Sequence, residues 1–321
     1  MTEVLAPRHH LLAITLVIIA GCSQTAPVAR RTLSLQQATH LLWPEEVSAA
    51  YRPPTEQQRR ALGELIAALW AGVTPRAATE LARTARRAGM VLELWTIGRR
   101  PTWVVREPAT DPHGLGVYLI HAAARPQDRP ILLEAPHVYF DLETEGVAAD
   151  MFWAPDARPA IHGLFTSSTH RYQRAGKRRK RRFNPADVAH NSEHPFQTAT
   201  AAVIAVGPVV VIQLHGFDDD RRKSTVHAIV SAARPEGSTV ESSRVAATLA
   251  ATTGVTVARF PEDTSSLGGL DNVQGRLIAA TPTARFVHVE LEPALRSRLR
   301  AGLAARWARA LVEVLAGART P

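Results

Sequence analysis

Three apolar runs in this chain share one design, since each ends in side chains that can bind a metal or move a proton: residues 131–136 before His137 and Asp141, residues 209–214 before His215, and residues 286–289 before Glu290. In α/β proteins, buried strands that end in titratable groups are a usual place for the chemistry. A catalytic zinc ion commonly takes three nitrogen or oxygen ligands, so two histidines and one carboxylate make a complete set. A further carboxylate can take a proton from water and pass it to a leaving amine. The three runs therefore predict a metal-dependent hydrolase.

Each segment also has an explanation without chemistry. The first can be a strand followed by a helix cap, with Asp141 or Thr144 as the cap. Glu290 can pair with Arg285 or Arg296 instead of moving a proton. The metal site is favoured because all three strand ends occur in one chain.

The elements that must position these residues alternate between strands and helices. Strands are expected at residues 90–97, 102–106, 116–122, 130–136, 160–168, 209–215, 226–233, 255–260 and 286–292. Helices are expected to begin near residues 34, 55, 75, 143, 196, 242 and 293. This alternation predicts an α/β fold with a mostly parallel or mixed sheet and helices on both faces.

The same segments resemble the successive motifs of the poly-γ-glutamate hydrolase family of zinc peptidases, over residues 130–297. The residues that carry the resemblance are Pro136-His137 with Asp141 and Thr144, then Leu214-His215-Gly216, then Glu290-Leu291 with Leu295-Arg296. The resemblance implies a three-layer, phosphorylase/hydrolase-like and zinc carboxypeptidase-like fold, with Zn²⁺ as the cofactor. It further implies these roles by position: His137, Asp141 and His215 as metal ligands, Glu290 as general base, and Arg296 as a support or a contact for a substrate carboxylate.

The chain departs from the family pattern at the first motif. Val138 and Tyr139 stand where the family has two glycines, which removes backbone freedom at the turn. Asp141 replaces a glutamate, so its reach is one methylene shorter, and the ligand role could pass to Glu143.

Further residues are candidates for contact with a substrate. His190 could line the pocket or bind the scissile carbonyl, although a surface loop histidine is an equal alternative. Asn272 and Gln274 offer amide donors that suit a carboxylate or a peptide. The basic segment from Lys177 to Arg182 is either a solvated loop or a rim that attracts an anionic substrate or surface.

The N-terminus resembles a bacterial lipoprotein signal. Residues 11–20 are apolar but too few to span a bilayer, and Ile18 to Cys22 looks like a lipobox. The resemblance implies cleavage before Cys22, its lipidation, and a cell-envelope location facing the periplasm or exterior. Cys22 is the only cysteine, so no disulfide can form within the chain. We expect a signal peptide at 1–21, a tether at 22–50, a region packed on the core at 51–125, and a hydrolase domain at 126–321.

Composition narrows the function classes. The chain has 321 residues, 45% of them hydrophobic, and a net charge of +9, so it is globular and suited to anionic partners. We do not expect nucleic acid as a partner, because export would separate this protein from nucleic acid and aromatic residues are not interleaved with the basic ones. No nucleophile elbow or phosphate loop is present.

These observations predict an exported, lipid-anchored zinc hydrolase that cleaves an amide bond in an acidic peptide-like or cell-wall substrate. An N-acetylmuramoyl-L-alanine amidase is an alternative within this class. The alternative from another class is a non-catalytic lipoprotein on the same fold that binds anionic wall polymer or lipid.

Overall fold

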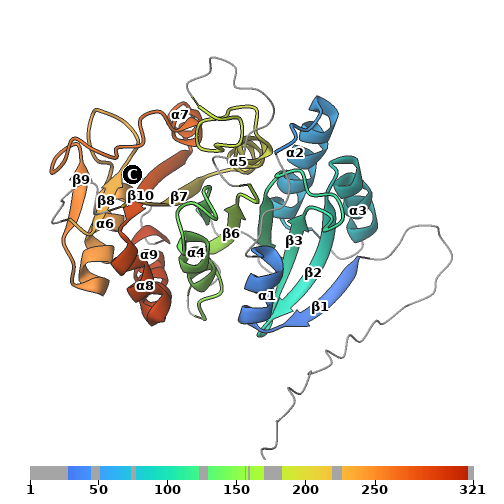
Figure 1. Cartoon of the computed structure of the whole chain (residues 1–321), viewed down its shortest axis with the longest axis horizontal. Coiled ribbons are helices and arrows are strands. Elements are labelled where there is room, and N and C mark those ends of the chain that lie inside the picture. Colours follow the sequence, from blue (N-terminus) through green and yellow to red (C-terminus); the bar gives the residue numbers. More distant parts are fainter. Residues whose placement is uncertain are drawn as a thin grey trace, which may run out of the picture.

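One mixed sheet runs through the molecule. The computed structural model describes residues 28–44, 51–73, 77–122, 129–155, 157, 160–169, 183–218 and 226–316. The sheet has ten strands in the order β1-β2-β3-β4-β6-β5-β7-β10-β8-β9 (Figure 1). They are β1 (Ala29–Leu33), β2 (Val91–Ile97), β3 (Arg100–Arg106), β4 (Val117–His121), β5 (Ile131–Ala135), β6 (Ile161–Thr166), β7 (Val209–Gly216), β8 (Ala228–Ser231), β9 (Val257–Phe260) and β10 (Ala284–Leu291).

Helices cover both faces of this sheet, which confirms the predicted α/β architecture. The first face packs against α1 (Leu35–Leu42), α4 (Thr144–Phe152), α6 (Val240–Thr253), α8 (Pro293–Arg298) and α9 (Ala304–Ala316). The second face packs against α2 (Glu56–Ala71), α3 (Ala78–Arg87), α5 (Pro195–Val206) and α7 (Val273–Ala279). Each layer of helices shields one apolar face of the sheet from water.

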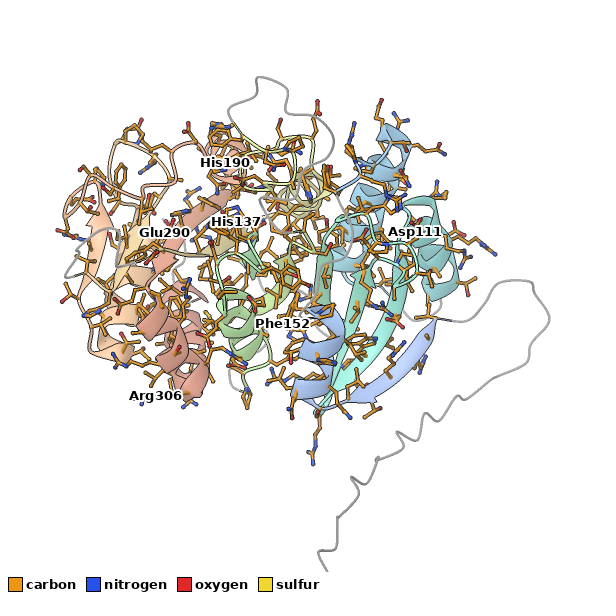
Figure 2. All side chains as sticks on the ribbon, in the orientation of Figure 1. Asp111, His137, Phe152, His190, Glu290 and Arg306 are labelled. Atoms are coloured by element: carbon orange, nitrogen blue, oxygen red, sulfur yellow. The ribbon has the colours of Figure 1, made fainter. Side chains whose placement is uncertain are left out.

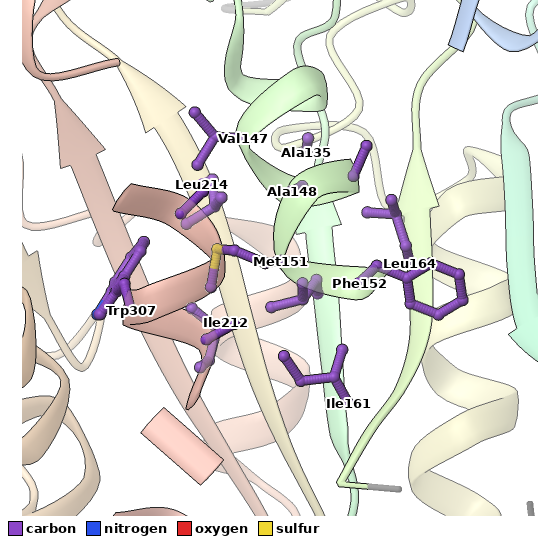
Figure 3. Close-up of a cluster of buried hydrophobic side chains, with 14 of the residues drawn as sticks. Ala135, Val147, Ala148, Met151, Phe152, Ile161, Leu164, Ile212, Leu214 and Trp307 are labelled. Carbon is purple, nitrogen blue, oxygen red and sulfur yellow. The ribbon is translucent and has the colours of Figure 1, made fainter. Parts of the chain in front are cut away.

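The central strands β6, β5, β7 and β10 are parallel to one another and buried on both faces. Side chains alternate between faces along a strand. Leu133 and Ile212 therefore enter the core of the first face, whereas Leu132 and Val211 enter that of the second. Figure 3 shows part of the first core, where α4 covers these strands. Such double burial explains why the runs are continuously apolar.

Most predicted elements are present within a few residues of the expected bounds. Thr55 and Gln58 form the predicted capping box of α2. The C-terminal helix, predicted as continuous from Pro293, is interrupted by a π turn in which Gly302 has a φ of 118°. The strand β1 was not predicted, and it lies within the range assigned to a tether. It pairs with β2, so the sheet begins at residue 29.

Two predicted features lie outside the described residues. These are the N-terminal signal with Cys22 and the basic segment from Lys177 to Arg182. Among the described residues, no helix combines the length and apolar character that crossing a membrane requires.

Candidate metal centre

The candidate site forms where three parallel strands end at one edge of the sheet. On the second face of β5, β7 and β10, the apolar residues give way near the carboxyl ends to buried polar ones, namely Glu134, Gln213, His215, His288 and Glu290. Glu290 pairs in register with His215. Because neighbouring residues in register face the same side, the strand geometry brings these side chains together.

A tight turn after β5 adds two more groups. The Asp141 amide donates to the His137 carbonyl at 2.8 Å, so the chain makes one helix-like turn between them. Tyr139 has a φ of 72° in this turn, a left-handed conformation that is costly for a residue with a Cβ. Val138 is fully buried in the core of the first face. The chain thus accommodates both departures from the glycine pair, with backbone strain at Tyr139.

Three side-chain atoms converge at the centre of the site. His137 Nδ1 lies 3.2 Å from Asp141 Oδ2 and 3.1 Å from His215 Nδ1. His215 Nδ1 lies 3.3 Å from the same Asp141 oxygen. A tetrahedral zinc site with bonds of about 2.0–2.2 Å has ligand atoms roughly 3.3–3.6 Å apart. The three atoms therefore fit a metal ion, and the shorter side chain of Asp141 reaches far enough. Of these three residues, His137 is labelled in Figure 2.

The outer nitrogen of each ring is held by a buried acceptor. His137 Nε2 is 2.9 Å from Asp187 Oδ1, and His215 Nε2 is 2.8 Å from Gln213 Oε1. In a neutral imidazole, a ring nitrogen that donates outward leaves the other nitrogen with a lone pair, as metal-ligating histidines require. Both histidines thus direct Nδ1 toward Asp141.

The charges around the site favour a cation at its centre. Burial acts to lower the pKa of His137, but the Asp141 and Asp187 carboxylates outweigh it and raise that pKa to about 9. Burial acts to raise the pKa of Asp141, yet His137 and His215 hold it well below its usual value. Two facing Nδ1 lone pairs repel each other unless a proton or a metal ion lies between them. The donor set matches zinc, which binds neutral imidazole and carboxylate.

A cleft of about 490 Å³ opens beside these residues. His137, His215, Glu290, His190 and Leu270 are among the residues that line it. Glu290 is buried, and its carboxylate lies within 4.8 Å of a ring nitrogen of His215. The structure thus brings the predicted general base to the predicted ligands.

His288 is a further histidine in the cleft, and its sequence position predicts no role for it. Its ring is tilted against that of His215, with centroids 4.6 Å apart, and its Nε2 is 3.7 Å from Glu290 Oε1. Burial and the neighbouring His215 and His137 lower its pKa well below the usual value, so the ring is neutral.

His190 is among the residues that line the cleft, which is one of the two placements expected from the sequence. Its ring stacks on Phe183 with centroids 3.9 Å apart. Its Nδ1 is 3.0 Å from Asp187 Oδ1, but in an orientation that makes no hydrogen bond.

Arg296 lies behind the metal centre and not among the residues that line the cleft. A Cβ placed on Gly216 would lie 1.6 Å from Arg296 Nη1 and 3.2 Å from the Asp141 Cβ, so only glycine leaves room for the guanidinium. Burial lowers the pKa of Arg296, while Asp141, Glu143 and other carboxylates oppose this effect. This placement suits the predicted support better than the predicted contact with a substrate. The carboxylate of Glu143 accepts a hydrogen bond from Ser297 instead of joining the site.

The amides of Asn272 and Gln274 are used inside the protein. Asn272 Oδ1 accepts from the Gly275 amide as the N-cap of α7, and its Nδ2 donates to Gln213. Gln274 is fully buried and donates to the Val188 carbonyl. Asn272 lines the cleft and its Nδ2 carries a second hydrogen, so its contact with a substrate stays a prediction, whereas Gln274 is not among the residues that line the cleft.

Four side chains of the site have no role predicted from the sequence: Glu134, Asp187, Gln213 and His288. A charged or amide residue inside an otherwise apolar strand is a signal that could have identified Glu134 and Gln213, since such groups need buried partners. Asp187 gives no comparable signal, because it reaches His137 from a loop 50 residues away.

Comparisons with known proteins find weak similarity of structure. No protein family profile and no curated protein matches the chain. A gene product, Atu2144, from Agrobacterium tumefaciens aligns over 59% of this chain and 91% of its own, with 16% identity and a TM-score of 0.39. An N-formylglutamate amidohydrolase from Ralstonia eutropha aligns over 59% and 92%, with 16% identity and a TM-score of 0.34. A metallo-carboxypeptidase from Burkholderia cenocepacia aligns over 82% and 70%, with 13% identity and a TM-score of 0.39. Scores this low assign neither family nor activity, so the poly-γ-glutamate hydrolase resemblance stays a prediction.

Proposed function

We propose that this protein is a zinc-dependent hydrolase that cleaves an amide bond in a peptide-like substrate. The observation that supports it is the convergence of His137 Nδ1, Asp141 Oδ2 and His215 Nδ1 within 3.1–3.3 Å of one another. Both rings are fixed at Nε2 by outward partners, and both direct Nδ1 at the same carboxylate oxygen of Asp141.

The reaction adds water across the C–N bond of the amide. Bound zinc would polarise the carbonyl and lower the pKa of a water molecule. Glu290 is placed to take one proton from water and to deliver it to the leaving nitrogen, so that a carboxylic acid and an amine are released. Neutral His288, beside Glu290, can donate a hydrogen bond to the substrate within the cleft.

We propose a peptide-like amide as the substrate. Acidic peptides and cell-wall peptides are the first classes to test. The described residues that line the cleft include no lysine or arginine. A positively charged contact for an acidic substrate would therefore come from outside this lining, and the basic segment from Lys177 to Arg182 is one candidate in the sequence.

The test begins with the metal content of the purified protein. We expect close to one zinc ion per chain, lost in His137→Ala and His215→Ala but kept in His162→Ala. His162 is an equally buried histidine that contacts Trp70 outside the site, so this variant is the matched control. Mass spectrometry of the metal measures the zinc content of the wild type and of each variant.

Activity is tested on γ-glutamyl, muramoyl-alanine and C-terminal peptide amides. We expect one class to release amine, to stop releasing it with a chelator, and to resume with added zinc. A natively folded protein that stays free of metal in excess zinc would overturn the proposal and favour a non-catalytic binding protein.

We also propose export and lipidation at Cys22. Labelling with palmitate should appear in the wild type and be absent from Cys22→Ser. Label that persists in the variant would contradict the lipid anchor without affecting the metal site.

A further inference from the structure

A second row of buried polar side chains lies directly beneath the metal centre. Glu134 on β5 pairs in register with Gln213 on β7, and Gln213 pairs in register with His288 on β10. Glu134 and Gln213 are completely buried, three positions before His137 and two positions before His215, respectively. Buried polar groups need partners, so this row must be satisfied within the protein.

Glu134 determines which way the Gln213 amide points. Its Oε2 accepts from Gln213 Nε2 at 2.7 Å, and its Oε1 accepts from the Thr200 hydroxyl at 2.5 Å. Burial raises the pKa of Glu134 to about 7, so ionised and neutral forms are both populated near neutral pH. In the neutral form the proton can lie on Oε1 toward Thr200, and Oε2 still accepts from Gln213. The NH₂ group of Gln213 faces Glu134 in both forms.

Asn272 fixes the same amide from the opposite side. Its Oδ1 caps α7 by accepting from the Gly275 amide at 2.9 Å, so its NH₂ group must point the other way. That group donates to Gln213 Oε1. Two independent hydrogen bonds therefore place the Gln213 oxygen where His215 Nε2 meets it at 2.8 Å.

An oxygen at this position accepts a hydrogen bond and cannot donate one. We propose that Glu134 and Asn272 are positioning residues that orient the Gln213 amide, and that Gln213 holds His215 in the Nε2–H tautomer with its Nδ1 lone pair facing the metal. The effect on zinc binding rests on the proposed function. The tautomer of His215 is a property of the metal-free protein and can be measured without zinc. The partner of His137 Nε2 is the Asp187 carboxylate. The partner of His215 Nε2 is the Gln213 amide, which the Glu134 carboxylate orients.

The decisive experiment is nitrogen NMR of histidine side chains in the metal-free, full-length protein, with the His215 signals identified by their absence from His215→Asn. We expect the wild-type ring to carry its proton on Nε2. In Gln213→Leu and Glu134→Leu, we expect a substantial population with the proton on Nδ1. Zinc affinity should fall by about 10- to 100-fold in both, the usual effect of removing an outer partner of a ligand.

Two variants separate orientation from general loss of packing. Glu134→Gln keeps an oxygen that can face Gln213 and an NH₂ group that can face Thr200, so it should keep the wild-type tautomer and affinity. Thr200→Val removes the bond on the far side of Glu134, so it should lower the stability while leaving the tautomer unchanged.

Several results would overturn the inference. One is a wild-type ring protonated on Nδ1, and this measurement needs no variant to fold. Another is an unchanged tautomer in both leucine variants. If the wild type failed to bind zinc yet showed the Nε2–H tautomer with the predicted responses, the proposed function would fail while the positioning role stood.

Discussion

The two faces of the central strands differ most where the strands end. On the first face, β5, β7 and β10 stay apolar to their last residues, as at Ala135, Leu214 and Leu291. On the second face, the same strands turn polar at Glu134, Gln213 and His288. Neighbours along one strand therefore serve different ends: one residue stabilises the fold through burial, and the next positions a group for chemistry.

The largest expected effect comes from the polar face. His215→Ala removes one of the three converging ligand atoms, so we expect zinc to be lost and amide hydrolysis to fall by at least about 10³-fold, or about 4 kcal/mol of transition-state stabilisation. Metal analysis and turnover of the substrate identified above measure it. A variant that kept its zinc and its turnover would show that His215 is not a ligand.

The adjacent residue tests the apolar face. Leu214 is fully buried among α4 and the strands, so Leu214→Ala should lower the free energy of unfolding by about 2–5 kcal/mol. Its zinc content should stay at the wild-type level, because its side chain faces away from the cleft. Urea unfolding and metal analysis on the same preparation measure both. Loss of zinc from a folded Leu214→Ala variant would contradict the conclusion that the first face stabilises the fold while the second face binds the metal.

The third prediction concerns the pH dependence of stability. Burial raises the pKa of Glu134 from 4.5 to about 7, so the folded state holds its proton more tightly than the unfolded state. The contribution of Glu134 is thus fully present below about pH 4.5 and is lost as the pH rises to about 7, by about 3 kcal/mol. Glu134→Gln lacks this titration. Its unfolding free energy relative to wild type should therefore rise between pH 5 and pH 7.5, as measured by urea unfolding. Parallel curves for the two proteins would contradict the shifted pKa.

The smallest expected effect lies at the end of β7. Gly216→Ala places a methyl group against the Arg296 guanidinium, so we expect a stability loss of about 1–3 kcal/mol and a few-fold weaker zinc binding as Arg296 moves from Asp141. Gly207→Ala is the control, because a Cβ there meets nothing within 4 Å, and its effect should stay within about 0.5 kcal/mol. Equal stability of the two variants would mean that Arg296 moves aside without cost.

The sequence predicted the parts of the site that depend on local pattern. Apolar runs that end in His137, His215 and Glu290 gave the strands and the edge at which they meet, because parallel strands end together. The partners of these residues depend on which strands are adjacent, and that information is not local. Glu134 meets Gln213 only because β5 lies beside β7.

The sequence pattern did not predict β1 or α7, and each omission has a physical reason. The edge strand β1 is largely exposed and carries two arginines, so it lacks the apolar alternation of a buried strand. The helix α7 has only seven residues and follows a glycine-rich segment, although its N-cap Asn272 was singled out for another role. In both cases pairing or packing with distant residues supplies the stability that the local sequence does not.

The position of β1 has a consequence for how far the protein could stand from a membrane. The sheet begins at Ala29, and a chain covers at most about 3.6 Å per residue. A lipid on Cys22 would therefore hold the β1 edge within roughly 25 Å of the bilayer surface. The metal centre lies on strands well across the sheet from that edge (Figure 1). In a lipidated protein, the cleft would therefore lie farther along the sheet from the anchor than the first strand does.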